Sequence, residues 1–260
     1  MASRIASCRS FVVFADEFVR AARTLTDRSE LKLLMEAVTR ELHFRHYALI
    51  HHGELGGSRS DLVDLKDYPE TIVEELFGQG RFRRDPVIRG CLFSGSAFAW
   101  SELPQILQLS RYDRASLQNG ARAGLNDGIT VPYVRLGDPM GSCTFAGTRQ
   151  PQLVHSHVGV AQMVGIFAFQ AARRFVAAHQ EPVPYSAKLH PRPRDCVILA
   201  GRGYSNKQIA RALSLAPRTV DGYLTEARRL LAAHDRTELV ISALLAGEID
   251  LSEIVSRQPG

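Results

Sequence analysis

The stretch YSNKQIARALSLAPRTVDGYLTEARRLL, from Tyr204 to Leu231, contains two short helical patterns separated by a few residues. Pro217 suits the first turn of the second helix, where its missing N–H breaks no bond, although Ala216 is a weaker N-cap than serine or aspartate. The stretch therefore predicts a helix, a short turn and a second helix. The apolar residues that share one helical face are Ile209, Ala210 and Leu213 before the break at residues 214–217, and Val220, Leu224, Ala227, Leu230 and Leu231 after it.

The faces left free by this packing carry polar and basic side chains. They are Lys207, Gln208, Arg211, Arg218, Thr219, Asp221, Tyr223, Thr225, Arg228 and Arg229. A helix-turn-helix that reads DNA needs such a face, because its second helix meets base edges while basic residues meet phosphates. A helical hairpin with a solvated outer face has the same periodicity, so the spacing alone leaves both interpretations open.

Positive charge is concentrated on this part of the chain. Residues 188–236 contain ten Lys or Arg and four Asp or Glu, an excess of six positive charges, whereas the whole chain has a net charge of +5. A locally basic segment favours a polyanionic partner, because each neutralised phosphate releases condensed counterions. The charge distribution therefore favours the DNA-binding interpretation.

Length and composition allow two domains. A chain of 260 residues can hold one domain of roughly 170 to 180 residues and a second of about 70. No apolar run approaches the roughly 20 residues that span a bilayer, and the acidic pair Asp16 and Glu17 interrupts the apolar patch near the N-terminus, so we expect a cytoplasmic protein with no membrane partner. QEPVPYSAK has two prolines and no periodicity, which predicts a linker. We expect domains over residues 1–179 and 189–260, with the linker over 180–188.

Neither the cysteines nor the histidines indicate a metal site. The four cysteines are scattered without a CxxC pair, so reduced and mostly buried thiols are expected; they are Cys8, Cys91, Cys143 and Cys196. Four histidines lie close together, but no second cluster supplies the remaining ligands of a structural site; they are His43, His46, His51 and His52. No nucleophile elbow, phosphate-binding loop or dinucleotide fingerprint is present. We therefore expect no cofactor and no enzymatic activity.

The N-terminal part alternates between helical and strand patterns. An apolar helical stripe runs from Leu31 to Leu42, and a second helix is expected from Pro69 until Gly78 and Gly80 stop it. Strands are expected at residues 46–52 and 62–65, and a hairpin at GITVPYV and GSCTFAG, residues 128–134 and 141–147. A long helix at residues 152–179 suits either the core or a dimer seam. These patterns predict an α+β domain with an antiparallel sheet flanked by helices, followed by a small all-α helix-turn-helix domain.

These segments resemble a known family. KLHPRPRDCVILAGRGYSNKQIARALSLAPRTVDGYLTEARRLLAAHDRTELVISALLAGEI, residues 188–249, is similar to the C-terminal DNA-binding domain of LuxR-type quorum-sensing regulators over roughly 60 residues. GYSNKQIA, RTV with a leucine four residues after its valine, and RTELVISAL carry the similarity. The N-terminal part resembles the family's autoinducer-binding domain at Tyr68 and Pro69, at DPVI from Asp85, at Trp100 and at GLNDGITVP from Gly124.

The resemblance implies a set of ligand-binding residues. In family members that bind N-acyl-homoserine lactones, the aspartate of DPVI accepts a hydrogen bond from the ligand amide, which implies that Asp85 is a polar anchor; alternatively, Asp85 caps a turn before Pro86. Tyr68 and Trp100 match aromatic residues of the family's pocket, although either suits an ordinary core. Thr144 lies where the family often places a hydroxyl toward the ligand carbonyl.

Two departures concern this pocket. Where the family typically has a tryptophan that donates to the lactone carbonyl, this chain has Ile72, and where a tyrosine is typical it has Leu76. A lactone carbonyl buried there would lose a partner, at a cost of about 1 to 3 kcal/mol. Three interpretations remain open: the lactone binds differently, the pocket accepts a more apolar or aromatic signal, or the domain is independent of a ligand.

The DNA-binding end also departs from the family. Pro193 replaces a common glutamate, and Gly222 in the middle of the second helix costs about 0.5 to 1 kcal/mol relative to alanine. The resemblance implies that Asp221 and Thr225 face base edges with Tyr223 nearby. The residues expected to hold phosphates are Lys207, Arg218, Thr219, Arg228 and Arg229.

A final helical pattern suits the pairing of two DNA-binding domains. Its apolar residues are Leu239, Ile241, Ala243, Leu244 and Leu245. Such a symmetric dimer would read an inverted repeat in double-stranded DNA. The family resemblance implies a homodimer that responds to an N-acyl-homoserine lactone or a related signal and binds promoter DNA. A response regulator would need an acidic receiver strand at the start of the chain, whereas Asp16 and Glu17 are the only adjacent acids there. A ligand-independent or inhibitory partner that heterodimerises with a related regulator remains the alternative.

Overall fold

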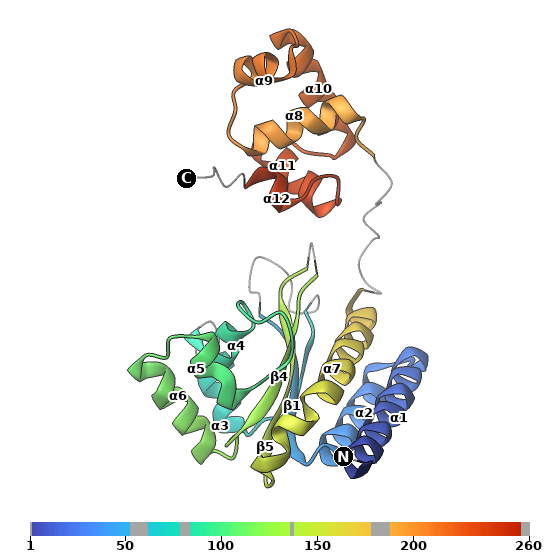
Figure 1. Ribbon diagram of the computed structural model, residues 1–260, viewed down its shortest axis with the longest axis vertical. Coiled ribbons are helices and arrows are strands. Elements are labelled where there is room, and N and C mark those ends of the chain that lie inside the picture. The colour runs from blue at the N-terminus through green and yellow to red at the C-terminus, as the bar shows by residue number, and fades with distance from the viewer. Residues whose placement is uncertain (1, 53–61, 79–83, 136–137, 178–187, 256–260) are drawn as a thin grey trace. The chain divides into compact units, whose positions relative to one another are not determined.

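The computed structural model describes residues 2–52, 62–78, 84–135, 138–177 and 188–255, with the side chains of residues 2–10 and 77–78 left out (Figure 1). The chain divides into two compact units, residues 1–181 and 182–260. The expected linker at 180–188 lies, except for its last residue, outside the described residues.

The first unit is an antiparallel sheet flanked by helices, which confirms the expected α+β class. Its strands are β1 (Phe44–His51), β2 (Asp64–Lys66), β3 (Phe98–Ala99), β4 (Gly128–Tyr133) and β5 (Gly141–Thr148). Its α-helices are α1 (Ala2–Thr24), α2 (Arg28–Glu41), α3 (Glu70–Val73), α4 (Pro86–Gly90), α5 (Leu103–Ile106), α6 (Arg111–Arg122) and α7 (Val154–Ala177). Shorter turns are the π-helical η2 (Glu74–Gly78) and the 3-10 turns η4 (Trp100–Glu102) and η5 (Pro151–Leu153).

The sheet has the strand order β2-β1-β5-β4-β3 and is covered by helices on both faces (Figure 1). Helices α1, α2 and α7 lie on one face and α3 to α6 on the other. In register, Leu49 pairs with Cys143 and Ala48 with Thr144, so neighbouring residues of each strand point to opposite faces. The hairpin expected at residues 128–134 and 141–147 is confirmed as the antiparallel pair β4 and β5.

Helix α7 packs directly on the sheet. A Cβ added to Gly165 would lie 2.8 Å from the Cβ of Val131, so the glycine allows the helix backbone to approach β4 closely. The apolar positions expected for this helix lie in the core: Val154, Ala161 and Ala168 are buried, and Val158 and Phe175 pack against the same cluster. Most of the pattern is therefore explained by the core of this unit.

One expectation for the first unit needs correction, and one helix was missed. The strand expected at residues 62–65 instead spans Asp64–Lys66, as β2. Its bounds are determined by its pairing with β1, in which Leu65 pairs with Leu49. Helix α6 was not expected from periodicity. Its start is defined by a capping box, in which the Ser110 hydroxyl accepts from the backbone N–H of Asp113 and the Asp113 carboxylate accepts from that of Ser110.

The second unit consists of five helices within the described residues: α8 (Pro191–Gly201), α9 (Asn206–Leu213), α10 (Pro217–Leu230), α11 (Arg236–Leu245) and α12 (Leu251–Ile254). Helix α9 starts at Ser205, whose hydroxyl accepts from the N–H of Gln208, and ends at Ser214 in the left-handed region with φ 54°. Helix α10 starts at Pro217, and Ala216 caps it without a side-chain hydrogen bond. The expected helix, turn and helix are therefore confirmed.

The core of this unit uses the predicted apolar stripe. Ile209, Ala210, Val220, Leu224 and Ala227 are all buried. Leu213 and Leu231 pack against this core, whereas Leu230 is 38% exposed.

The start of α8 accommodates the unusual Pro193, which is buried at the third helical position, where a missing N–H breaks no intrahelical bond. The next residue, Arg194, donates from Nη2 to both carboxylate oxygens of Glu253 at 2.7 and 2.8 Å, and from Nε to the carbonyl of Glu248 at 2.8 Å. These bonds connect α8 to α12. They stabilise the first turn of α8, in which position 193 is a proline and not a glutamate.

The dimer seam expected near the end of the chain is only partly available. Leu239 and Ala243 are buried in the core of their own unit, because α11 packs on α8. Ile241 and Leu245 are 50% and 41% exposed. The sequence predicts α11 as the last helix, but the short helix α12 follows it. On α11, only the residues of the outer face are therefore left for a dimer contact.

Gly222 gives a test of the α10 packing. Nothing lies within 4 Å of a Cβ added at this exposed helical position, so Gly222→Ala should stabilise the protein by about 0.5 to 1 kcal/mol. The measurement is the midpoint of thermal unfolding. Gly165→Ala is the matched control and should lower that midpoint, since its Cβ would overlap Val131. A loss of stability in Gly222→Ala would contradict the open position of Gly222.

Candidate functional site

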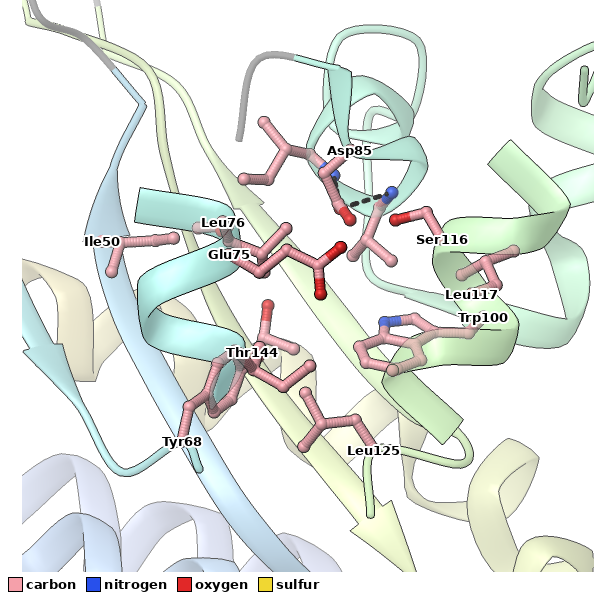
Figure 2. A pocket seen from close by; sticks show the side chains of 15 residues that line it. Ile50, Tyr68, Glu75, Leu76, Asp85, Trp100, Ser116, Leu117, Leu125 and Thr144 are labelled. Atoms are coloured by element: carbon pink, nitrogen blue, oxygen red, sulfur yellow. Dashed lines mark hydrogen bonds between the residues drawn. The ribbon is translucent and has the colours of Figure 1, made fainter. Parts of the chain in front are cut away.

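A cavity lies on the face of the sheet that α3 to α6 cover (Figure 2). It contains about 650 Å³ of space unoccupied by protein atoms, part of it open to solvent. The strands contribute Ile50, Ser142 and Thr144 to its floor. The residues that line the rest are Tyr68, Ile72, Glu75, Leu76, Asp85, Val87, Ile88, Trp100, Ser116, Leu117, Gly120 and Leu125.

Each residue expected to bind a ligand lies on this cavity. These are Tyr68, Ile72, Leu76, Asp85, Trp100 and Thr144, which come from the segment of residues 68–76, the N-cap of α4, η4 and β5. Their contact with one cavity is consistent with the expectation, while their binding of a ligand stays a prediction. Ile72 is 5% exposed, and it packs with Leu125 and Ala146 where the family has a tryptophan.

Asp85 is the cap of a helix that begins at Pro86, one of the two roles that the sequence left open, while its role as a polar anchor for a ligand stays a prediction. Its Oδ1 accepts hydrogen bonds from the N–H groups of Val87 at 2.9 Å and Ile88 at 3.1 Å, so it is the N-cap of α4. The same carboxylate faces the cavity (Figure 2). Burial raises the pKa of Asp85 to about 6, against the opposing effect of the two N–H groups.

Helix α4 is connected to α6 by a partly buried ion pair. Arg89 donates from Nη1 to Oδ1 of Asp113 at 2.8 Å, and Asp113 is 2% exposed. Burial alone would raise the pKa of Asp113, but hydrogen bonds from Ser110 and Arg89 hold it below its ordinary value. The pair connects α4 to α6 and thereby positions Asp85 at the cavity wall.

A chain of hydrogen bonds crosses the cavity floor. Trp100 donates from Nε1 to the hydroxyl of Thr130 at 3.0 Å, and the hydroxyls of Thr130 and Thr144 are 3.1 Å apart. Tyr68 interacts with Thr144 from the other side, and burial raises the pKa of its phenol. The Trp100 ring also needs Gly128, where a Cβ would lie 2.9 Å from the ring. The indole N–H that matches the family's pocket is therefore already engaged within the protein.

The sequence interpretation missed Glu75. Its carboxylate points into the cavity from η2 (Figure 2). Ile72, Glu75 and Leu76 have the i, i+3, i+4 spacing that places residues on one helical face, so the spacing was a signal that could have revealed it. Ser116 and Ser142 were also missed, because nothing in their local sequence places them on this cavity.

The residues expected to contact DNA lie on α9 and α10. Five of them are exposed: Lys207, Arg218, Asp221, Thr225 and Arg229. Thr219, Tyr223 and Arg228 are half-buried, and Tyr223 packs against the core of its unit. Asn206 donates to Asp221 at 3.3 Å, and Arg228 donates to the Thr225 hydroxyl at 3.1 Å. The two residues expected to face bases are therefore held by neighbouring side chains.

The ranges that the structure describes hold neither a metal-binding cluster nor a membrane-spanning helix. No group of three or more His, Cys, Asp or Glu in these ranges is arranged to hold a metal ion. In the same ranges, none of the helices combines the length and hydropathy that crossing a bilayer requires. Cys91, Cys143 and Cys196 are buried free thiols, and the side chain of Cys8 lies outside the description.

Comparison with known proteins agrees with this division of the chain. Residues 27–172 match the family model of the autoinducer binding domain, and residues 187–243 match that of the bacterial regulatory proteins of the luxR family. The first match alone covers more than half of the chain. The chain belongs to the LuxR family of bacterial transcriptional regulators.

Two relatives and one solved structure show how similar the chain is to individual proteins. It is 31% identical over 188 residues to RpaR of Rhodopseudomonas palustris, a quorum sensing-dependent transcriptional regulator, covering 72% of this chain and 73% of RpaR. It is 26% identical to y4qH of Sinorhizobium fredii over 77% of this chain, but spans only 61% of the length of y4qH. The structure of SdiA in complex with octanoyl-rac-glycerol has a TM-score of 0.58 at 16% identity, covering 91% of this chain and 95% of SdiA, so it shares the fold.

The raised pKa of Asp85 predicts how the stability of this LuxR-family protein depends on pH. The folded state retains a proton at Asp85 up to about pH 6, whereas the ordinary pKa is 3.8, so the stability contributed by the neutral carboxyl is present below pH 3.8 and is lost as the pH rises through about 6. Asp85→Asn keeps a capping oxygen but cannot ionise. The melting temperature of the variant relative to wild type should therefore rise between about pH 4 and about pH 7. A constant difference over this range would contradict the raised pKa.

Proposed function

We propose that this protein is a transcription regulator that binds a small-molecule signal in its first unit and promoter DNA, as a homodimer, through its second. The observation that carries the proposal is the cavity on which all six residues expected for ligand binding lie. It occurs in a chain whose other unit has a helix-turn-helix with an exposed basic face. Family membership supports both halves of the proposal.

The cavity suits a ligand with an acyl chain and a polar head. Its empty volume is within the range of about 300 to 1,000 Å³ that small-molecule sites occupy. Most of the wall is apolar, with Asp85 as an acceptor for an amide N–H or a hydroxyl. RpaR is described as quorum sensing-dependent, and SdiA binds octanoyl-rac-glycerol. An N-acyl-homoserine lactone or a related acyl-chain signal is therefore the ligand class that we propose.

The proposed dimer is supported by exposed apolar residues in both units. Ile241 and Leu245 lie on the outer face of α11, and Met163 on α7 is 40% exposed. Removing such side chains from water on association is favourable. A symmetric dimer would read two half-sites related by a two-fold axis, so the expected DNA site is an inverted repeat.

DNA binding gives the direct test. If Arg218 and Arg229 hold phosphates, Arg218→Ala and Arg229→Ala should each weaken binding to specific and random DNA alike and reduce the slope of log affinity against log salt by about one. If Thr225 reads a base, Thr225→Ala should instead change which site is preferred. The measurement is a gel-shift titration at several salt concentrations, with an inverted repeat selected from random DNA.

A matched control removes the same charge elsewhere. Arg114 is an exposed arginine of α6, so Arg114→Ala should leave the salt slope unchanged. An equal loss of affinity for specific and random DNA in Thr225→Ala would contradict its role as a base reader. Because Arg228 donates to Thr225, changes at these two residues should not be additive.

One observation favours a second candidate, an inhibitory partner that heterodimerises with a related regulator. Asp221 and Glu226 place two negative charges on the exposed face of α10, which weakens the attraction to phosphates, and Gly222 lowers the stability of the same helix. The same gel shift distinguishes the two functions. Specific binding by the purified protein supports the regulator, whereas its absence at low salt, with and without signal, supports the inhibitory partner.

A further inference from the structure

The charged groups in the described lining of the cavity are hydrogen-bond acceptors, whereas a ligand carbonyl requires a hydrogen-bond donor. Of the fifteen described residues that line it, Glu75 and Asp85 carry carboxylates and none carries a positive charge. The positions where the family has indole and phenol donors hold Ile72 and Leu76. This helical face therefore presents two aliphatic side chains and the carboxylate of Glu75 to the cavity.

Glu75 lies in the middle of this face. It is half-buried on η2, between the apolar side chains of Ile72 and Leu76 in the helical spacing. Figure 2 shows its carboxylate in the space between Asp85 above and Thr144 below. Glu75 also interacts with another part of the protein. A carboxylate has about four acceptor sites, so it can accept a hydrogen bond from a ligand in addition to its own partner.

Two polar side chains on the other walls have partners within the protein. The Trp100 indole donates to Thr130, and the Ser142 hydroxyl is 2.9 Å from Nε2 of His52. A lactone carbonyl placed near Glu75 would oppose one acceptor with another, which is unfavourable in a partly enclosed site. A hydroxyl or an ammonium group at the same place would be bound by a charge-assisted hydrogen bond.

We propose that the signal of this protein carries a head group with hydrogen-bond donors, a hydroxyl or an ammonium group, and that Glu75 binds this head group. Asp85 supplies the second acceptor, and the apolar wall holds an acyl chain. The chain-binding residues are Ile50, Leu76, Val87, Ile88, Leu117 and Leu125. This inference rests on the proposed sensor function and selects the chemistry of its ligand.

Three ligands with one acyl chain and different head groups test the proposal. They are N-octanoyl-homoserine lactone, whose head presents a carbonyl, 1-octanoylglycerol, whose head presents hydroxyls, and N-octanoyl-ethylenediamine, whose head presents an ammonium group. Dissociation constants are measured by calorimetry on the full-length protein. We expect the tighter of the two donor-bearing ligands to bind at least about tenfold more tightly than the lactone, because hydrogen bonds to charged groups have that strength. Which of the two is tighter distinguishes a hydroxyl from an ammonium signal.

Glu75→Gln removes the charge and retains the size of the side chain. It should weaken binding of the donor-bearing ligand by about tenfold or more, and leave binding of the lactone unchanged or improved, since the amide can donate to a carbonyl. Glu74→Gln is the matched control, because Glu74 is the exposed neighbour on the same turn, and it should not alter the order of the ligands. The order in the wild-type protein tests the proposal even if Glu75→Gln does not fold.

The outcomes separate this inference from the proposed function. Tightest binding of the lactone by wild type, or a preference for donor-bearing ligands that survives in Glu75→Gln, would overturn the role of Glu75 and leave a ligand sensor in place. No binding of any of the three by wild type or either variant would overturn both. A preference for a donor-bearing ligand that is lost in Glu75→Gln and kept in Glu74→Gln supports the proposal.

Discussion

One face of the central sheet packs in the hydrophobic core and the other face lines the cavity, and the rest of the first unit depends on this difference. Along β5, Cys143 and Phe145 join the core beneath the helices, while Ser142 and Thr144 point to the cavity. The alternation follows from the pleat of a strand, in which successive side chains leave on opposite faces. A shift in register by one residue would place hydroxyls in the core and apolar groups in the cavity. Strand pairing therefore determines the chemistry of the cavity floor.

The cavity wall shows how structure and binding share one group. Asp85 caps α4, and it also faces the cavity with a raised pKa. A partly buried carboxylate destabilises the unit unless it is hydrogen-bonded, and its two backbone N–H partners compensate only in part. A ligand donor would complete the compensation. In this way a residue needed to start a helix also places a hydrogen-bond acceptor on the cavity wall.

The boundaries of the helix-turn-helix are set by local sequence signals. Helix α9 begins at a capping box, Ser214 adopts the left-handed conformation that ends it, and Pro217 begins α10. One stripe on each helix is buried in the unit's own core, which leaves the opposite stripes to solvent. Pro193 is accommodated in the first turn of α8, where its missing N–H breaks no intrahelical bond, and Arg194 connects this turn to Glu253. The surface available to DNA follows directly from the face that the core occupies.

The sequence by itself determined the helix pair, the β4–β5 hairpin and the α+β class, because these depend on periodicity, capping and short motifs. The six residues found on the cavity were implied by the family resemblance and not by these patterns. Only the tertiary structure decided the position of β2, the burial of Leu239 and Ala243, and the engagement of the Trp100 indole by Thr130. It also revealed that Glu75 faces the same cavity as Asp85. The reason is physical: strand partners, core contacts and hydrogen bonds join residues far apart in the chain, whereas a sequence pattern encodes only the direction of a side chain within its own helix or strand.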